Sequence, residues 1–355
     1  MSSNAINEQA LNDLLGRAIV DFGGASIAPL VLIGDRLGLY RALASQGAMT
    51  STQLATHTGT SERYVREWLN AQAASGYVSY DAETGRYSLS PEQALAFANE
   101  DGPAFIVGAF QTALAAGKIV DRLTEAFRSG EGIGWHEHDH QLFHGVERFF
   151  RSSYVGSLVQ SWIPALDGVE AKLRSGAKVA DIGCGHGAST IVMAKAFPNS
   201  EFAGFDYHPA SVAEANARAG RAGVGDRCKF EVASAKDFPD RRYDLVTVFD
   251  ALHDMGDPAG AARHVRSTLK PGGSWMIVEP YAGDRLEENL NPIGRAYYAS
   301  STMICTPCSL AQEVGLALGA QAGEARMRAV VTGAGFSQFR RAVHTPLNLV
   351  YEARL

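Results

Sequence analysis

Cysteine is scarce in this chain, with four residues in 355, so the sequence offers no disulfide framework of the kind found in small secreted domains. Cys305 and Cys308 form a single C-x-x-C pair, without the second pair or the histidines at ligand spacing that a zinc site requires. We therefore expect no metal centre, and we expect both thiols to lie in a buried helix or loop.

A surplus of basic charge is also missing. The chain has 32 Lys and Arg residues against 38 Asp and Glu residues, which gives a formal net charge of -6 at pH 7. Proteins that mainly bind phosphate backbones usually carry a basic surplus. The charge balance therefore argues against nucleic acid as the principal ligand.

Targeting and membrane signals are lacking as well. The first 15 residues contain Glu8 and Asp13 and no basic stretch followed by an apolar one, as a secretory signal would have. We see no apolar run long enough to span a bilayer. With 46% hydrophobic and 20% charged residues, the composition is that of a soluble enzyme, and we expect it in the cytoplasm.

The first half of the chain is predicted to be mostly helical. Leucines within 30–43 recur at helical spacing, and helices are expected to begin after Thr50 and Ser61, both typical capping residues. Two short strand-like segments, 76–80 and 86–90, flank a turn and predict a hairpin. Helix, turn, helix and hairpin together predict a winged helix.

The second helix of this winged helix would be the recognition helix of a DNA-binding protein. Here Glu62 and Glu67 balance Arg63 and Arg66, so the helix carries no basic surplus. We therefore favour a structural or dimerising role for the winged helix. A ligand-responsive transcription regulator remains a weaker alternative.

Residues 103–166 are again predicted to be helical, and they include His136, His138 and His140. An extended segment would place the three rings on one side, whereas a helix would scatter them. Metal binding, contact with a substrate and hydrogen-bonded structure are all open for this segment, and we name His138 and His140 as weak candidates for substrate contact.

The second half alternates strand and helix, which predicts a doubly wound α/β sheet. The last two strand-like segments, 339–344 and 349–354, are joined by only four residues, so they must pair antiparallel. We place the domain boundary at 167/168, with a helical domain at 1–167 and the sheet domain at 168–355. The five earlier strands are expected at 178–182, 201–206, 228–232, 243–249 and 274–279.

A glycine-rich turn follows the first of these strands. Gly183, Gly185 and Gly187 form G-x-G-x-G, in which the third glycine comes one position too early for the dinucleotide fingerprint. Asp181 ends the preceding strand, where a carboxylate could meet the ammonium group of an amino-acid moiety. Asp206 ends the second strand, where a carboxylate can accept both ribose hydroxyls.

With these features the second half resembles class I S-adenosylmethionine-dependent methyltransferases. The whole chain is similar to the bacterial subgroup with an N-terminal winged-helix dimerisation domain. The resemblance implies a Rossmann-like methyltransferase sheet with an antiparallel last strand, S-adenosylmethionine as the cofactor and a homodimer formed through the first half. Ser234 departs from the aspartate that many members have there. The implied cofactor-binding residues are Asp181, Gly183, Cys184, Gly185, Gly187, Asp206, Tyr207, Ser234, Ala235, Asp250 and Ala251.

Residues 252–257 resemble the His-Asp-x-x-Asp stretch of winged-helix small-molecule O-methyltransferases, including plant phenol enzymes. This resemblance implies that His253 is the general base and that Glu279, at the end of the fifth strand, orients it. Glu313 is our guess for a second orienting acid. In the alternative interpretation His253 only hydrogen-bonds the cofactor or caps the next helix.

The segment 281–323 is expected to close over the methyl acceptor. Tyr297, Tyr298 and Met303 are candidate walls of the acceptor pocket, although aromatic residues at this spacing are as often plain core. The predicted function is methyl transfer to a small molecule, favouring a hydroxyl oxygen of an apolar or aromatic acceptor. The alternative within enzymes is a methyltransferase fold that uses its cofactor for other chemistry, such as decarboxylation or cyclisation.

Overall fold

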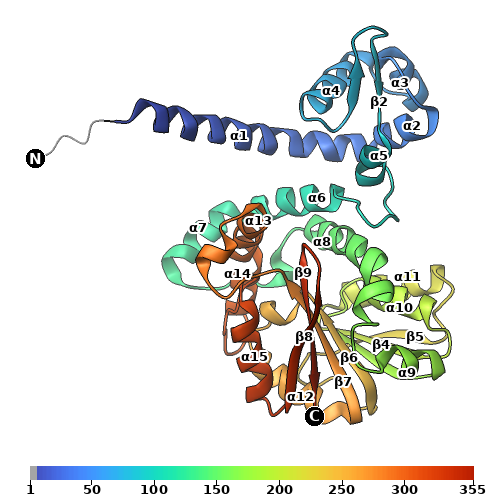
Figure 1. Ribbon diagram of the computed structural model, residues 1–355, viewed down its shortest axis with the longest axis vertical. Helices are drawn as coiled ribbons and strands as arrows, with labels where there is room; N and C mark the ends of the chain where they lie inside the picture. Colours follow the sequence, from blue (N-terminus) through green and yellow to red (C-terminus); the bar gives the residue numbers. More distant parts are fainter. Residues whose placement is uncertain (1–5) are drawn as a thin grey trace, which may run out of the picture.

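The computed structural model describes residues 6–355. A small winged-helix part lies at one end of the molecule, a larger α/β part lies at the other, and helices lie between them (Figure 1). The winged-helix part consists of α1 (Glu8–Arg36), α2 (Leu39–Gln46), α3 (Ser51–Thr58), α4 (Glu62–Ala74), β1 (Ser79–Asp81), β2 (Arg86–Ser88) and α5 (Pro91–Phe97).

The predicted winged helix is present, with the predicted cap of α3 and the predicted hairpin. Thr50 caps α3 in a capping box with Gln53, and β1 pairs antiparallel with β2. Trp68 of α4 packs against α1, where its Nε1 donates a 2.8 Å hydrogen bond to the Leu30 carbonyl oxygen. A Cβ on Gly34 would lie 2.3 Å from the Trp68 ring, so glycine lets the two helices approach.

The expectation about membrane-length segments was wrong for α1. This helix has 29 residues and is long and apolar enough to cross a membrane by length and composition, although polar residues such as Asp13 and Asp21 interrupt it. Only 28% of its apolar window is buried, and its N-terminal half extends beyond the winged helix, away from the rest of that part (Figure 1).

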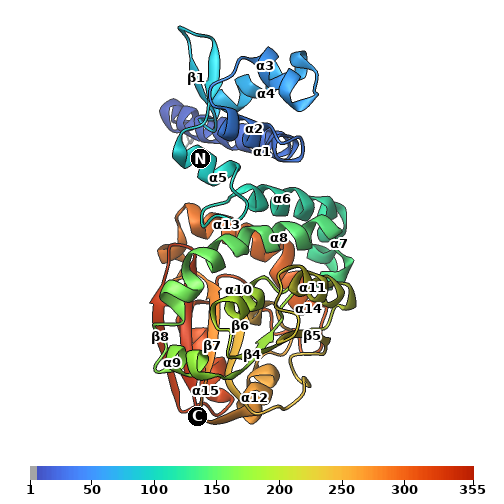
Figure 2. The same ribbon diagram turned by 90° about the vertical axis from the view of Figure 1, so that its right-hand side faces the viewer.

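A helical layer connects the two parts and lies over one edge of the sheet (Figure 2). The helices α6 and α8 pack closely, because a Cβ on Gly108 would lie 2.4 Å from the backbone of Phe149 and one on Gly145 would lie 2.7 Å from that of Thr112. The layer consists of α6 (Val107–Ala116), η1 (Gly117–Ile119), α7 (Val120–Ser129), η2 (Trp135–Glu137), α8 (His140–Ser153) and η3 (Tyr154–Trp162).

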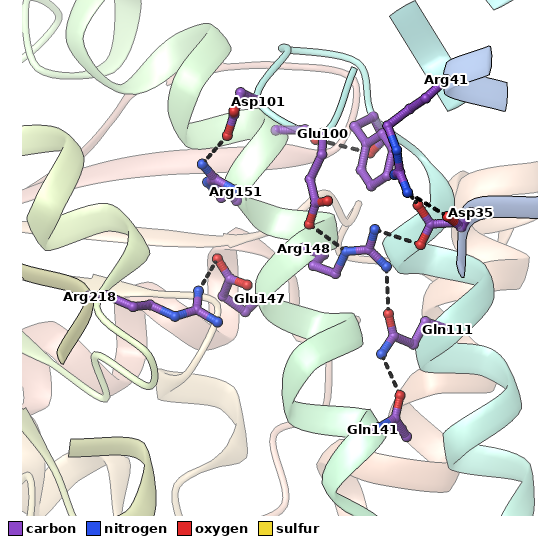
Figure 3. A network of polar contacts seen from close by, with 12 residues as sticks. Asp35, Arg41, Glu100, Asp101, Gln111, Gln141, Glu147, Arg148, Arg151 and Arg218 are labelled. Carbon is purple, nitrogen blue, oxygen red and sulfur yellow. Dashed lines mark hydrogen bonds and ion pairs between the residues drawn. The ribbon is translucent and has the colours of Figure 1, made fainter. Parts of the chain in front are cut away.

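A network of charged and amide side chains fixes α8 beside the winged-helix part (Figure 3). Arg148 of α8 donates to Asp35 of α1 at 2.9 Å, to Glu100 at 2.8 Å and to Gln111 of α6 at 2.9 Å. On the other side, the neighbouring Glu147 forms a 2.8 Å ion pair with Arg218 of α11. The position of α8 is therefore tied to both parts of the molecule.

The larger part contains a seven-stranded sheet in the order β5-β4-β3-β6-β7-β9-β8. The strands β3 to β7 are parallel, and β9 pairs antiparallel with both β7 and β8, as the short connection predicted. The strands are β3 (Lys178–Ile182), β4 (Glu201–Asp206), β5 (Cys228–Val232), β6 (Tyr243–Phe249), β7 (Leu269–Pro280), β8 (Gln338–His344) and β9 (Asn348–Arg354).

Helices cover both faces of this sheet, and two apolar cores fill the spaces between them. Residues of η3 such as Leu158 and Trp162 belong to one of these cores, so the chain already packs against the sheet before position 168. The remaining helices are α9 (Val169–Ser175), α10 (Ala188–Ala196), α11 (Pro209–Arg221), η4 (Leu252–Asp254), α12 (Pro258–Thr268), η5 (Leu286–Asn289), α13 (Pro292–Ser300), η6 (Ser301–Cys305), α14 (Thr306–Leu310) and α15 (Gly323–Gly333).

Candidate active site

A cavity of about 630 Å³ opens at the carboxyl ends of β3, β4, β5 and β6. This is the edge at which open α/β sheets bind their ligands. Turns after these strands form one side of the cavity, and α8, η3, α13 and η6 form the other. The cavity therefore lies between the sheet and a cover to which the helical layer and the predicted closing segment 281–323 both contribute.

The glycine turn borders the cavity through Gly183 and Gly185, whose φ angles of 69° and 51° suit glycine. The amide of Gly185 donates a 2.9 Å hydrogen bond to Oδ2 of Asp206, which joins the first turn to the second. Gly187 has a different role from the predicted cofactor contact. A Cβ there would lie 2.5 Å from the Phe230 ring, so this glycine allows close packing behind the turn.

Asp181 does not have the position that the sequence suggested. Its carboxyl group is 1% exposed, and it accepts hydrogen bonds from the hydroxyls of Ser189, Thr190 and Thr247. Burial raises the pKa of Asp181 to about 6, although these hydrogen bonds oppose the shift. The side chain anchors the start of α10 below the turn and lies outside the wall that residues 6–355 form around the cavity.

Asp206 does border the cavity, as predicted. Its carboxylate accepts hydrogen bonds from the amides of Gly185 and His208, both at 2.9 Å, and these bonds fix its orientation. Burial raises the pKa of Asp206, and the two amides oppose that shift. A carboxylate has about four lone-pair sites, so acceptor capacity remains for two ribose hydroxyls.

The other predicted cofactor positions also border the cavity: Cys184, Tyr207, Ser234, Ala235, Asp250 and Ala251. Ser234 is held by Asp237, whose Oδ1 accepts a 2.7 Å hydrogen bond from its hydroxyl. The spacing of an aspartate three residues later, Ser234-x-x-Asp237, is a turn signal that our sequence reasoning did not use.

Asp250 has a strained backbone at the end of β6, with a φ of 49°. Its Oδ1 accepts a 2.8 Å hydrogen bond from Nδ2 of Asn348, a fully buried residue at the start of β9. Burial and the neighbouring Glu279 raise the pKa of Asp250 well above its ordinary value. Asn348 was missed because nothing local in the sequence shows that β9 begins beside the carboxyl end of β7, the neighbour of β6.

His253 and Glu279 form the pair that the resemblance implied. Nδ1 of His253 lies 2.5 Å from Oε2 of Glu279, and the two residues are 2% and 4% exposed. Since a carboxylate accepts hydrogen bonds, we assign the proton of the neutral ring to Nδ1, which leaves the lone pair of Nε2 free for a further partner. His253 borders the cavity, but Nε2 also faces a carboxylate oxygen of Asp254, so this nitrogen can accept a proton from a bound molecule only while the ring is neutral.

Asp254 lies next to the same ring, with Oδ1 at 3.0 Å from Nε2 of His253. Burial opposes the charged form of this imidazole, but Asp254 and Glu279 outweigh it and raise the pKa of His253 well above its ordinary value. Glu313, our guess for a second acid, instead forms a 2.6 Å ion pair with Lys236 at the surface. Asp254 is therefore the second carboxylate near the base.

The weak substrate candidates divide into one residue that borders the cavity and three that do not. Met303 is in the wall, whereas the wall built by the described residues leaves out His138, His140 and Tyr298. Of the two adjacent tyrosines of α13, Tyr297 borders the cavity and Tyr298 does not, because neighbouring positions on a helix point about 100° apart.

His138 and His140 point in different directions at the start of α8. His138 is buried, with Nε2 at 3.8 Å from Sγ of Cys308, while the side chain of His140 is 73% exposed. The chain turns from η2 into α8 between them, which ends the alternation that a straight strand would have kept. Both cysteines of the C-x-x-C pair are buried, as expected.

Most of the apolar wall was missed in the sequence because it comes from the helical layer. The aromatic residues of this layer that border the cavity, none of which our sequence reasoning assigned to it, are Trp135, Phe143, Phe149, Phe150 and Tyr154. Their spacing on α8 and η3 is helical, and the same spacing is typical of ordinary core residues. Only the packing of α8 over the sheet shows that these side chains border a cavity.

Residues 173–328 match the family described as "Methyltransferase domain", and residues 25–99 match the "Rv2258c-like winged HTH domain". Among curated proteins, the 27-O-demethylrifamycin SV methyltransferase of Amycolatopsis mediterranei is 34% identical over 135 residues, which are 36% of this chain and 49% of that protein. The trans-aconitate 2-methyltransferase of Streptomyces avermitilis is 38% identical over 30% of this chain and 40% of its own length. The matched segments thus span about half or less of these relatives.

Solved structures share the fold over the whole chain. A putative O-methyltransferase from Nostoc punctiforme has a TM-score of 0.69 and 20% identity, and the match covers 99% of both chains. Human N-acetylserotonin methyltransferase, solved in complex with S-adenosylmethionine, has a TM-score of 0.70 and 17% identity over 100% of this chain and 99% of that one.

Proposed function

We propose that this chain, whose second half is an S-adenosylmethionine-dependent methyltransferase domain, transfers a methyl group to a hydroxyl oxygen of a small apolar or aromatic molecule in the cytoplasm. The observation that carries the proposal is the His253–Glu279 pair, buried at the cavity with Nδ1 and Oε2 2.5 Å apart. A hydroxyl acceptor must lose its proton, and a histidine oriented by a carboxylate is suited to take it.

The cavity fits this cofactor. Gly183 and Gly185 leave room for a ligand close to the backbone, and Asp206 has lone pairs free for the ribose. Carboxylates of Asp254 and Glu279 flank one imidazole and raise the pKa of His253, so this end of the cavity favours positive charge. A cationic ligand is favoured there.

When bound, the cofactor supplies a sulfonium methyl group with its own leaving group, so the protein must mainly position the acceptor and remove its proton. In our proposal His253 accepts that proton at Nε2 while Glu279 holds Nδ1. The raised pKa of His253 favours the charged ring, which cannot act as a base. A positive charge in the same cavity lowers that pKa and thereby favours the neutral, active ring.

The acceptor is proposed to be largely apolar because the rest of its end of the cavity is formed by Phe143, Tyr297, Met303 and Ile304. Aromatic walls of this kind bind flat rings by stacking and by excluding water. The site therefore favours phenolic or quinone-like metabolites over highly charged ones.

We further propose that the protein is a homodimer and that a second copy covers α1. The exposed apolar residues of its N-terminal half, among them Leu11, Leu15, Ile19 and Phe22, recur at helical spacing along one stripe. An apolar stripe of this length on a soluble protein marks an interface. Light scattering should report a dimer for the wild type and a monomer for the double variant Ile19→Glu/Phe22→Glu. The control Arg17→Glu should stay a dimer. Flotation of the wild type with lipid vesicles would instead favour a membrane as the partner of α1.

The reaction is tested by a thermal-shift screen of phenolic, quinone and acidic metabolites with S-adenosylhomocysteine bound, followed by mass spectrometry of turnover with S-adenosylmethionine. We expect an acceptor that stabilises the protein only together with the cofactor, and a product heavier by one CH2 group. Acceptor conversion without methyl gain would favour decarboxylation or cyclisation. Salt-sensitive binding to duplex DNA would favour a regulator.

A further inference from the structure

The side of the cavity that holds the base also contains a set of side chains with unlike ligand atoms. One atom from each of His253, Asp254 and Cys305 lies within 4.8 Å of the others. All three residues border the cavity, and His253 and Cys305 are buried. An imidazole nitrogen, a carboxylate oxygen and a thiol sulfur thus converge on one point at the cavity.

The histidine of this set is already held as a metal ligand would be. Glu279 accepts the Nδ1 proton at 2.5 Å, which orients the ring and leaves Nε2 facing Oδ1 of Asp254 at 3.0 Å. A carboxylate behind the histidine is the usual arrangement around zinc-bound imidazoles, where it fixes the tautomer and strengthens the ligand. The geometry that prepares a base therefore also prepares a metal site.

The sulfur ligand, Cys305, decides which ions fit the site. Sulfur and nitrogen ligands favour Zn²⁺ and similar transition metals, whereas Mg²⁺ and Ca²⁺ require mostly oxygen ligands. Zinc binds such ligands at about 2.0 to 2.3 Å, so tetrahedral ligands lie about 3.3 to 3.8 Å apart. The ligand atoms lie within 4.8 Å of one another, and the His253–Asp254 pair at 3.0 Å, so side-chain movements on the order of 1 Å or less bring all separations into that range.

We propose that His253, Asp254 and Cys305 bind a Zn²⁺ ion, with the fourth coordination position open to the cavity, and that the bound ion inhibits the enzyme. On binding, the thiol of Cys305 releases its proton to solvent and its sulfur donates to the ion. The inhibition rests on the proposed function, since the Nε2 lone pair cannot hold a metal and accept a proton at the same time. The metal site itself does not depend on it.

Binding is tested on the full-length protein after chelator treatment, with Co²⁺ as a spectroscopic substitute for Zn²⁺. We expect one equivalent of Co²⁺ to produce a thiolate-to-cobalt absorption band, and Zn²⁺ to abolish it by displacement. The variant Cys305→Ser should lose the band, while Cys308→Ser, which removes the buried thiol one helical turn further on, should keep it. Glu279→Gln should weaken Zn²⁺ binding by about 10- to 100-fold.

Absence of the band, or its persistence in Cys305→Ser with loss in Cys308→Ser, would overturn the site. Thermal melts of each variant show whether a lost band reflects unfolding. With a confirmed acceptor, micromolar Zn²⁺ should suppress turnover reversibly, and Cys305→Ser should require roughly 100-fold more Zn²⁺. Metal binding without loss of turnover would refute the proposed inhibition but not the metal site. If the proposed methyl transfer fails, the Co²⁺ absorption band should still appear, because the metal site does not depend on that function.

Discussion

Two partly buried clusters of charged side chains in this protein differ in how completely their atoms are paired. Around Arg148, each guanidinium nitrogen donates to an oxygen, of Asp35, Glu100 or Gln111, and Arg41 adds a second positive charge beside Asp35 (Figure 3). Around His253, three carboxyl groups share one imidazole. Among the residues described, an oxygen of Asp250 and one of Glu279 are buried without a hydrogen-bond partner.

The difference separates a structural cluster from a functional one. A buried charge that is fully paired holds helices in register, and removing one partner leaves another charge uncompensated. A buried carboxyl group with an unsatisfied oxygen is costly, and in native proteins such groups concentrate at sites that bind ligands or protons. We therefore assign the Arg148 cluster to the placement of α8 and the His253 cluster to chemistry.

The largest expected effect is on the reaction. Replacing His253 with alanine should lower kcat/KM by about 10²- to 10⁴-fold, because the acceptor keeps its proton in the transition state. Cofactor affinity, measured by calorimetry with S-adenosylhomocysteine, should change little. His57→Ala, which removes an exposed histidine of α3, is the control. Full turnover by the His253→Ala enzyme would show that the His253 cluster has no role in the reaction.

The opposite pattern is expected for Arg148. Arg148→Met should lower the free energy of unfolding by about 1.5 to 3 kcal/mol, since the largely buried Asp35 keeps only Arg41 and the half-exposed Glu100 loses its partner. The neighbouring Arg151→Met removes only the exposed pair with Asp101 and should cost at most about 1 kcal/mol. Denaturant melts compare the two variants, and equal losses would contradict a structural role specific to Arg148.

His186 allows a test at the glycine turn. It borders the cavity, and burial together with the nearby Arg218 lowers the pKa of His186 to about 4. The unfolded chain binds this proton below its ordinary pKa near 6.5, so this residue makes stability fall as the pH drops from 6.5 towards 4. His186→Asn should remove on the order of 2 kcal/mol of that loss. If the free energies of unfolding of variant and wild type fall equally as the pH drops from 6.5 to 4, His186 is not the source of the pH dependence.

The smallest expected effect concerns the charge balance around His253. Carboxylates of Asp254 and Glu279 raise the pKa of His253, so kcat/KM should rise with pH until the ring loses its proton. Asp254→Asn removes one carboxylate and should move this acid limb to lower pH by about one unit. An acid limb that stays in place, measured across pH 5 to 9, would mean that Asp254 does not influence the base.

Much of the α/β part could be predicted because its signals are local. The strands are short apolar runs, the glycines mark the first turn, and four residues between the last two strands force an antiparallel pair. Asp206 ends one strand and His253 follows another, and the carboxyl ends of these strands lie at one edge of the sheet, so the presence of both residues at one cavity was also predictable. Asp181 was misplaced because its hydroxyl partners Ser189 and Thr190 come from the helix after the turn, which the motif does not include.

The sequence by itself determined the winged helix, the order of the α/β elements and the glycine turn at the cavity, since each follows from residues close together in the chain. Only the tertiary structure decided what faces the cavity. The aromatic wall comes from α8, the placement of α8 depends on Arg148 and Asp35, 113 positions apart, and Cys305 reaches His253 from a distant segment. Contacts between such distant positions depend on packing, which local patterns do not encode.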